Sequence, residues 1–481
     1  MERLNMPHWF RAALLPLILA LLILSVPVPA GAQDTPDLAR LYKEASKRKG
    51  KRPVIIIPGI LGSELINKRT GEKVWFKIGR SSDDDVRLPI NLNLEESRDD
   101  LVPGDIVRKL DIPLFKDIEI YQELIVALER YGGYTQGTWD ENEQSLDDKY
   151  FLFPYDWRRD NVETARILFR KVEKLKRDSG NPDAVFNVIA HSMGGLITRY
   201  AAMYGDKDLT EGPYEPTWPG DMHFGKIFLF GTPNEGSADA LQVLLEGWGA
   251  VKNINLPFVR DVTPVELLTM PAAFQLLPHA GTFHAYDEFL KPLNIDLYDA
   301  KTWIKYNWSF YGRKDIFKDF SEAEVGRMEQ YLEVVLNRAR NFHTALNADG
   351  EERGNVAYFI IGSDCRPTLD GVVIYRDEKN QRWVTLAEDD SFRRSDGVKV
   401  DDKAVEALIF QPGDGRVSRR SLLAETLAED KRLSVLYDSA LPLTHALFVC
   451  EEHDKLTGNK TIQNNLLTAL VSEASLSSRV E

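Results

Sequence analysis

Residues 184–195 read Ala-Val-Phe-Asn-Val-Ile-Ala-His-Ser-Met-Gly-Gly, and the rest of the chain is organised around them. Val185 to Ile189 is a short apolar run rich in β-branched residues, which predicts a buried strand. Apolar residues recur at helical spacing from Leu196 onward. A strand, a tight turn with Ser192 at its tip and a helix are the layout of a nucleophile elbow, and small residues two positions either side of the serine suit the sharp bend. The alternative is an ordinary serine that caps the following helix.

Strands and helices alternate on both sides of this stretch. Apolar runs predict further strands at 53–58, 150–153, 227–230, 356–361 and 446–450, and amphipathic segments predict helices at 118–128, 162–175, 322–346 and 461–471. Such alternation is typical of an α/β protein with a mostly parallel sheet.

The alternation of predicted strands and helices stops between 238 and 345, where prolines and aromatic residues are frequent. We therefore expect an insertion that covers one edge of the sheet. The predicted organisation is a signal peptide at 1–32, a first part of the core at 33–237 with an irregular insertion at 64–117, a cap or lid at 238–345, and a second part of the core at 346–481.

The N-terminus has the pattern of a secretory signal peptide. Arg3 and Arg11 make a mildly positive start, the segment from Ala12 to Val28 is almost wholly apolar, and Ala30-Gly31-Ala32 is a cleavage site of small residues. The apolar segment is near the length that spans a bilayer, so an uncleaved anchor is the alternative. We expect an exported protein, either periplasmic or secreted.

The composition is globular and acidic. Of 481 residues, 43% are hydrophobic and 28% charged, and the formal net charge is −14. Without a basic patch interleaved with aromatic residues, we expect no nucleic-acid partner. The negative charge also disfavours electrostatic binding to anionic bilayers, so contact with a membrane surface would be hydrophobic and transient. No cluster of histidines and cysteines has metal-ligand spacing, and we expect neither metal nor cofactor.

The chain has two cysteines, Cys365 and Cys450. Each follows or ends a predicted strand, at 356–361 and 446–450. If these strands are neighbours, both thiols lie near the same edge of the sheet, and export favours a disulfide. Two buried free thiols are the alternative.

A nucleophilic serine needs a general base, and the order of a triad after an elbow is serine, acid, histidine. His453 lies in the loop after the last predicted strand, at the edge where catalytic groups of open α/β sheets gather. His445 is expected at the opposite end of that strand. The other histidines fit less well: His8 belongs to the leader, His191 is expected to point away from Ser192, His223 precedes a strand, and His279, His284 and His343 lie in the insertion. We predict His453 as the base; a surface histidine is the alternative.

Two aspartates are candidates for the acid that orients this base. Asp364 follows the strand at 356–361, and Asp414 lies in a turn between Gly413 and Gly415. Local sequence does not separate them, and either could merely stabilise a turn. For the oxyanion, the expected donors are the backbone amide of Met193 and that of Ile60 or Leu61, although Pro58 to Gly62 could be a plain tight turn.

The chain resembles the lecithin:cholesterol acyltransferase family, which includes lysosomal phospholipase and the phospholipid:diacylglycerol acyltransferases. The resemblance extends in order over most of the chain. It rests on Pro-Gly-Ile-Leu-Gly-Ser at 58–63, Phe-Pro-Tyr-Asp-Trp-Arg at 153–158, Ala-His-Ser-Met-Gly-Gly at 190–195, Gly-Thr-Pro-Asn-Glu-Gly-Ser at 231–237, Met-Pro-Ala-Ala-Phe-Gln-Leu-Leu-Pro at 270–278, the segment from Trp303 to Trp308, Gly-Asp-Gly-Arg-Val at 413–417, and His453.

The resemblance implies an α/β-hydrolase fold with a large helical cap, and it selects Asp414 as the acid because the family's Gly-Asp-x-Thr-Val motif carries that residue. It also maps the oxyanion donors onto the amides of Ile60 and Met193. Two departures lie beside the acid: Arg416 stands where the family usually has Thr, and Ser418 stands where Pro is common. Ala190 at the start of the elbow is shared with bacterial lipases, and we expect an exported bacterial member.

We therefore expect a serine-dependent hydrolase of lipid acyl esters, a lipase, phospholipase or esterase, with Ser192, Asp414 and His453 as its triad. The alternative is a lipid O-acyltransferase that passes the acyl group to a sterol or glycerolipid alcohol. A non-catalytic lipid-binding protein would predict a broken triad. The Asp156–Arg158 pair is expected to lock the fold rather than to take part in chemistry.

Overall fold

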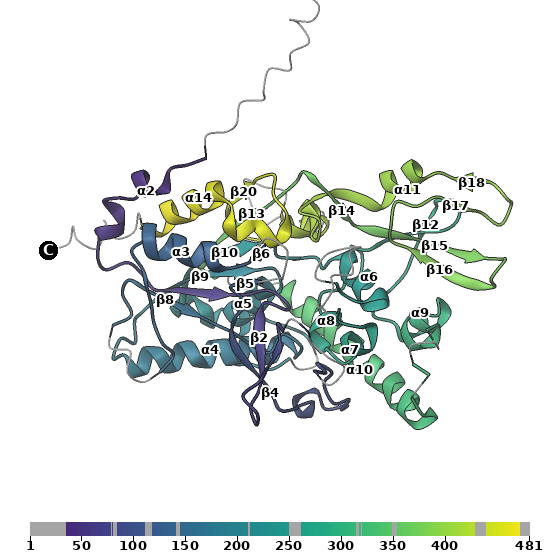
Figure 1. Ribbon diagram of the computed structural model, residues 1–481, viewed down its shortest axis with the longest axis horizontal. Helices are drawn as coiled ribbons and strands as arrows, with labels where there is room; N and C mark the ends of the chain where they lie inside the picture. Colours follow the sequence, from purple (N-terminus) through teal and green to yellow (C-terminus); the bar gives the residue numbers. More distant parts are fainter. Residues whose placement is uncertain are drawn as a thin grey trace, which may run out of the picture.

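A seven-stranded parallel sheet forms the centre of the molecule (Figure 1). The computed structural model describes residues 35–77, 79, 84–110, 118–140, 145–209, 212–249, 261–313, 317–318, 320–348, 354–428 and 439–471. In spatial order the strands are β20 (Leu443–Phe448), β13 (Ala357–Gly362), β10 (Phe224–Phe230), β9 (Phe186–His191), β1 (Val54–Ile57), β8 (Lys149–Leu152) and β7 (Thr135–Gln136). Each neighbouring pair in this sheet is parallel, which confirms the predicted α/β class.

Helices cover both faces of this sheet (Figure 1). In β1, residues 55 and 57 pack into one hydrophobic cluster and residues 54 and 56 into another, so the whole strand is buried. This double burial explains a continuous apolar run without alternation. The first cluster contains residues of α4 (Asn161–Asp178), α5 (Met193–Tyr204) and α10 (Glu322–Leu346), and the second contains residues of α2 (Leu38–Leu41), α3 (Gln122–Val126) and α14 (Lys460–Val471).

The helices predicted at 162–175, 322–346 and 461–471 are present as α4, α10 and α14. Helix α10 begins with a capping box, in which Ser321 and Glu324 satisfy each other's backbone amides. The helix predicted at 118–128 was partly wrong. Residues 118–119 form β6 (Ile118–Glu119), which pairs with β5 (Lys109–Leu110), and α3 begins at Gln122 before a π-helical turn over Ala127–Tyr131.

A second sheet lies beside the central one and joins two distant parts of the chain. Strand β11 (His284–Tyr286), from the predicted cap, pairs in parallel with β15 (Gly371–Asp377), from the predicted second part of the core. Neither strand of this pair was predicted from the sequence: β11 has three residues, too few to show a periodicity, and the seven-residue β15 was also missed. The sheet is completed by β12 (Pro292–Leu293) and β16 (Arg382–Leu386). The division of the chain at residue 345 stays a prediction.

The other elements lie around the carboxyl edge of the central sheet or outside it. They are β2 (Ser63–Asn67), β3 (Lys73–Trp75), β4 (Leu101–Ile106), α6 (Ala238–Glu246), α7 (Pro264–Leu268), α8 (Pro271–Phe274), α9 (Ala300–Lys305), β14 (Arg366–Leu369), β17 (Phe392–Arg393), β18 (Lys399–Val400), α11 (Asp402–Ile409), β19 (Phe410–Gly413), α12 (Arg419–Leu423) and α13 (Glu425–Ala428). Strands β2, β3 and β4 form a small antiparallel sheet within the segment expected to be irregular.

The predicted disulfide is present. Cys365 and Cys450 are bridged, with their Cα atoms 5.4 Å apart, so the alternative of two free thiols was wrong. Their strands β13 and β20 are neighbours in the sheet, as the prediction required. The predicted signal peptide lies outside the described residues. Within the part of the chain that the structure describes, no helix has both the length and the apolarity to cross a membrane.

Candidate active site

Ser192 lies in the turn between β9 and α5. Its backbone has φ 54° and ψ −124°, a conformation that non-glycine residues rarely adopt and that is typical of strained functional turns. Small neighbours permit this bend: a Cβ atom on Gly194 would lie 2.6 Å from the carbonyl oxygen of Pro58. The strand, turn and helix predicted around Ser192 are therefore all present.

The structure brings His453 and Asp414 together at the same edge of the sheet. Asp414 follows β19, and His453 begins a 3₁₀ helix after β20. Their side chains meet with 2.7 Å between Nδ1 of His453 and Oδ2 of Asp414. The other Asp414 oxygen accepts hydrogen bonds from the backbone amides of Val417 (2.7 Å) and Arg416 (2.9 Å). Asp364, the second candidate from the sequence, is exposed to solvent.

Burial and mutual attraction set the charges of this pair. Burial opposes the charged imidazolium, yet the carboxylate of Asp414 outweighs this effect, so the pKa of His453 is raised above its usual value. Burial likewise opposes the charge of Asp414, but attraction to His453 and the hydrogen bonds it accepts lower the pKa of this carboxyl group. The pair therefore favours a charged aspartate beside a histidine that readily holds a proton.

Gly231, at the end of β10, leaves room for this pair. Its φ is +54°, and a Cβ atom there would lie 2.9 Å from Oδ2 of Asp414 and 2.9 Å from Nδ1 of His453. Any side chain would therefore push into the gap where aspartate and histidine meet. This close approach accounts for the first glycine of the Gly-Thr-Pro-Asn-Glu-Gly-Ser motif.

The loop after β1 lies directly against the elbow. Ile57 pairs in register with Ala190, so the positions two residues further on, Gly59 and Ser192, come together; a Cβ atom on Gly59 would lie 2.8 Å from that of Ser192. A hydrogen bond from the Gly62 amide to the Gly59 carbonyl (3.1 Å) closes a turn at residues 59–62.

The two residues whose amides are expected to bind an oxyanion are Ile60, after β1, and Met193, directly after Ser192. Ile60 lines the cavity in front of the serine, within this turn. Met193 is the first residue of α5, where amide groups have no acceptor within the helix. The role of both amides as oxyanion donors stays a prediction.

His191, to which the sequence analysis gave no part in the site, lines the same cavity. Its ring centroid is 4.8 Å from that of His453. Its Nδ1 is 2.8 Å from the hydroxyl of Tyr121, a residue that sequence reasoning also missed. A histidine directly before the serine is visible in the sequence, but nothing in the sequence points to Tyr121 as its partner.

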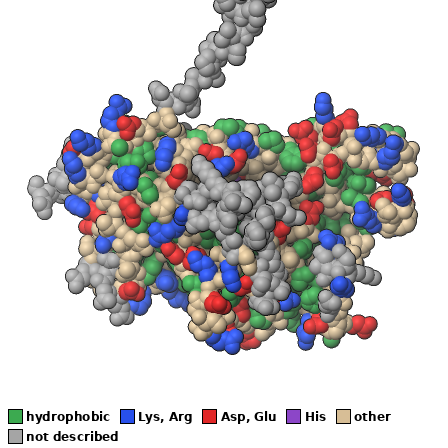
Figure 2. Space-filling view, in the orientation of Figure 1, with side chains coloured by type: hydrophobic (Ala, Val, Ile, Leu, Met, Phe, Trp, Pro, Cys, Tyr) green, Lys and Arg blue, Asp and Glu red, His purple; other side chains and the backbone are tan. Residues whose placement is uncertain are grey.

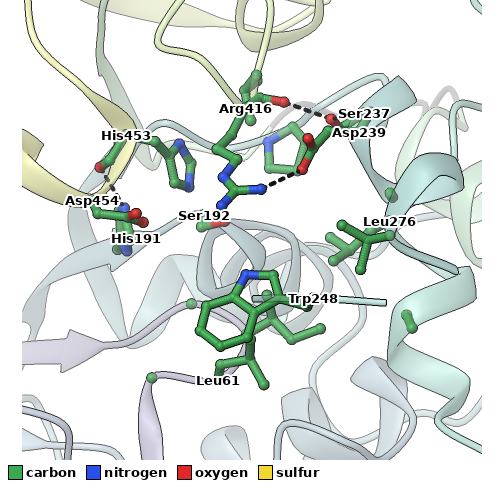
Figure 3. A pocket seen from close by; sticks show the side chains of 18 of the residues that line it. Leu61, His191, Ser192, Ser237, Asp239, Trp248, Leu276, Arg416, His453 and Asp454 are labelled. Atoms are coloured by element: carbon green, nitrogen blue, oxygen red, sulfur yellow. Dashed lines mark hydrogen bonds and ion pairs between the residues drawn. The ribbon is translucent and has the colours of Figure 1, made fainter. Parts of the chain in front are cut away.

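The cavity in front of Ser192 has about 1270 Å³ of free volume, counting the part open to solvent. One side of it is apolar and aromatic; this wall includes Leu61, Trp75, Phe76, Trp248, Leu267 and Leu276. The other side is polar, where Ser237, Asp239, Arg416 and Asp454 approach the serine and histidine (Figure 3). The site can therefore accept a molecule with one long apolar part and one polar part.

Arg416 reaches across the top of the cavity towards Ser237 and Asp239 (Figure 3). Its Nη1 donates a hydrogen bond to Oδ2 of Asp239 (2.9 Å), and its carbonyl oxygen accepts one from Ser237 Oγ (2.6 Å). Attraction to Asp239 raises the pKa of the guanidinium. The arginine that departs from the family pattern thus ties the Asp414 turn to the start of α6.

The second departure, Ser418, has a structural role. Its hydroxyl caps α12 by accepting from the amide of Ser421 (3.3 Å) and donates to Asp370 (2.8 Å). Arg158 is likewise structural. It is fully buried and pairs with Asp156 (2.8 Å) and Asp99 (2.6 Å). Among the described residues, no group of three His, Cys, Asp or Glu side chains is placed to hold a metal ion.

A parallel sheet between helices, a serine at the strand–helix elbow and an Asp–His pair at the same edge define an α/β-hydrolase. Residues 120–337 match the sequence model of the lecithin:cholesterol acyltransferase family. This match supports an enzyme that acts on lipid acyl esters, as a hydrolase or as an acyltransferase.

Several solved structures align with parts of this chain, each with a TM-score under 0.5. The structure of the Tle4–Tli4 complex aligns with a TM-score of 0.49 and 13% identity, over 88% of this chain and 99% of that chain. The mature lipase BlEst2 of Bacillus licheniformis aligns with a TM-score of 0.32 and 10% identity, over 88% and 92% of the two chains. The phospholipase PlaB of Legionella pneumophila gives 0.25 and 14%, over 65% and 39%. No curated protein matches the chain.

Proposed function

We propose that this protein is a serine-dependent hydrolase of lipid acyl esters, with Ser192 as nucleophile, His453 as general base and Asp414 as the acid that orients the base. The observation that carries the proposal is the 2.7 Å contact between Asp414 and His453 in the cavity that Ser192 also lines. These three residue types in this chain order form the triad of the α/β-hydrolases.

The proposed reaction has two halves. Because Nδ1 of His453 faces Asp414, Nε2 is the nitrogen left to take the proton of Ser192 as its oxygen attacks the ester carbonyl. The amides of Ile60 and Met193 bind the oxyanion of the tetrahedral intermediate. The intermediate expels the alcohol, which receives the proton from His453, and leaves an acyl group on Ser192. Water, deprotonated by His453, then releases the fatty acid.

The two sides of the cavity support a lipid substrate. An acyl chain would lie along the apolar wall that contains Trp75 and Trp248, where its burial is favourable by roughly 25 cal/mol per Å². The polar alcohol part of the ester would face Asp239 and Arg416. A lipid of this kind is presented at a membrane surface, so the enzyme would touch membranes transiently, and the leader would export it to the periplasm or the medium.

Acyl transfer is the second candidate, and the match of residues 120–337 to the lecithin:cholesterol acyltransferase family favours it. The same acyl-enzyme would form, and a sterol or glycerolipid alcohol would replace water in the second half. Product analysis with a phospholipid donor, in the presence and absence of each alcohol, separates the two: a new ester supports transfer, whereas free fatty acid alone supports hydrolysis.

Covalent labelling tests the proposal. A fluorophosphonate should form one adduct, found by peptide mass spectrometry on Ser192 and not on Ser237, a serine of the same cavity whose hydroxyl donates to the carbonyl oxygen of Arg416. Ser192→Ala should lose both the adduct and the turnover of phospholipid and short-chain esters. Near-normal turnover by Ser192→Ala would contradict the proposal.

A further inference from the structure

A chain of buried polar groups connects the loop after β1 with the loop that carries His453. The amide of Gly59 donates to the hydroxyl oxygen of Tyr121 (2.9 Å), this hydroxyl lies 2.8 Å from Nδ1 of His191, and Nε2 of His191 lies 3.2 Å from the carbonyl oxygen of His453. Tyr121 and His191 are both buried. Four segments that are far apart in the sequence are thus joined by three hydrogen bonds.

The donors and acceptors in these three hydrogen bonds can be assigned in only one way. A carbonyl oxygen can only accept, so Nε2 of His191 must carry a hydrogen and donate to His453. Burial, together with the neighbouring His453, lowers the pKa of His191 to about 4, so its ring is neutral near pH 7 and Nδ1 has no hydrogen. Nδ1 therefore accepts the hydroxyl proton of Tyr121, whose oxygen is left to accept from Gly59.

The two ends of this hydrogen-bonded series lie at two parts of the proposed active site. Gly59 immediately precedes Ile60, the proposed oxyanion donor, and His453 is the proposed base. His191 is covalently attached to Ser192 between them. Catalytic groups must be held within fractions of an ångström of their productive positions. Hydrogen bonds that set the spacing of the Ile60 loop, Ser192 and His453 can therefore control the rate without contacting the substrate.

We infer that Tyr121 and neutral His191 are positioning residues, which hold the oxyanion loop and the base loop at their catalytic distance from Ser192. The inference rests on the proposed function and adds two cavity residues to which that mechanism gives no chemical step. Their polar side-chain atoms form hydrogen bonds within the protein. Through these bonds they position the backbone of Gly59 and of His453.

Tyr121→Phe tests the inference because it removes one oxygen and leaves the ring. Active sites are first titrated with a fluorophosphonate, so that kcat is expressed per competent serine and a misfolded fraction does not count. Per titrated site, kcat for a soluble short-chain ester should fall about 10- to 100-fold, with KM within about twofold. Inhibition by an alkylboronic acid, which forms a tetrahedral adduct on the serine, should weaken in proportion.

Tyr331→Phe is the matched control. Tyr331 is fully buried in α10 and donates its hydroxyl to the carbonyl oxygen of Thr269 (2.7 Å), away from the cavity. This variant should lose stability to a similar degree but keep the kcat of its titrated sites. An equal fall of kcat in both variants would show a structural role for Tyr121 and overturn the inference.

His191→Gln decides the question if Tyr121→Phe does not fold. The glutamine amide can still donate to His453, but it offers no acceptor at the position of Nδ1. The same selective loss of kcat and boronate affinity is expected, and combining the two substitutions should cost little more than either alone. If kcat per titrated site stays within twofold of wild type, the inference fails while the proposed function stands. A wild-type enzyme that does not titrate at all would refute the proposed function itself.

Discussion

Asp414 and His453 are joined twice, once through their side chains and once through their backbones. Besides the 2.7 Å contact of the carboxylate with Nδ1, the amide of His453 donates to the carbonyl oxygen of Asp414 (2.9 Å). The backbone hydrogen bond fixes the main chain of His453 against that of Asp414. The imidazole therefore has little freedom to turn away from the carboxylate. The acid and the base therefore behave as one rigid unit.

Asp414→Asn tests the electrostatic part of this unit. His453 must be neutral to accept a proton, and Asp414 raises its pKa, so kcat/KM should fall as the pH drops through a pKa above 6.5. Without the carboxylate, burial would lower that pKa, with the charge of Asp454 opposing this only in part, and the acid limb would move to lower pH. The maximal rate should drop by about 10⁴-fold, measured from pH–rate profiles. Asp364→Asn, at the rejected acid, should change neither quantity; if it does, the acid is misassigned.

Gly231→Ala should disable the enzyme by a clash at the acid–base pair. The added Cβ meets both Asp414 and His453, so kcat should fall about 100-fold or more. Gly180→Ala is a matched control, because Gly180 has φ +67° and open space around its missing side chain. Both variants should lose about 1–2 kcal/mol of unfolding free energy through the positive φ, measured by urea denaturation. Full activity of Gly231→Ala would argue against the close approach.

Arg416→Thr introduces the residue that the family usually has and breaks the pair with Asp239. The two side chains are 25% and 11% exposed, so a largely buried carboxylate loses its partner and the free energy of unfolding should fall by about 3 kcal/mol. Asp239→Asn should also destabilise, and the double variant should recover about 1–2 kcal/mol relative to the sum. Urea denaturation of the four proteins measures this coupling, and strict additivity would show that the pair contributes no stability.

Reduction of the disulfide should weaken both the fold and the site. Cys365 and Cys450 are exposed to solvent, and Cys450 is three residues before His453. Opening the bridge should lower the free energy of unfolding by about 2–4 kcal/mol and reduce activity as the base loop loosens. The measurements are the thermal midpoint and kcat with and without dithiothreitol. The double variant Cys365→Ser with Cys450→Ser should resemble the reduced protein and ignore the reductant; a wild type that ignores it too would contradict the prediction.

Most of the central sheet was predictable because its inner strands are largely apolar, whereas the two-residue edge strand β7 (Thr135–Gln136) is polar and exposed and was not predicted. Val54–Ile57 and Phe186–His191 are buried on both sides, and this burial leaves a strong signal in the sequence. The position of His453 followed from one rule, that the carboxyl ends of parallel strands share an edge. Asp414 did not follow from local sequence, since Asp364 satisfied the same rule, and the resemblance to a family was needed to prefer it.

Other parts of the molecule left no local signal. Strand β11 is three residues long and is defined by its pairing with β15, more than 80 residues later in the chain. The place of Tyr121 depends on the approach of the loop after β1 to the elbow, which no pattern within residues 118–128 reveals. Because contacts of this kind are set by the tertiary fold alone, the second sheet and the His191 partner appeared only in the structure.

On the face shown in Figure 2, acidic and basic side chains are interspersed rather than gathered by sign. Among the described residues on this face no broad basic field is seen, in keeping with the net charge of −14.

Strand β20 lies at an end of the seven-stranded sheet and is bonded there to β13 alone among the described strands, and His453 follows it after a short loop. Edges of a sheet open locally at a lower free-energy cost than its centre, which here holds β9 and Ser192. In denaturant, the fraction of molecules that is active should consequently be smaller than the fraction that is folded. As denaturant rises, turnover should vanish before the circular-dichroism signal of the sheet does, so an assay of catalysis reports on the sheet's margin and a spectroscopic assay reports on its middle.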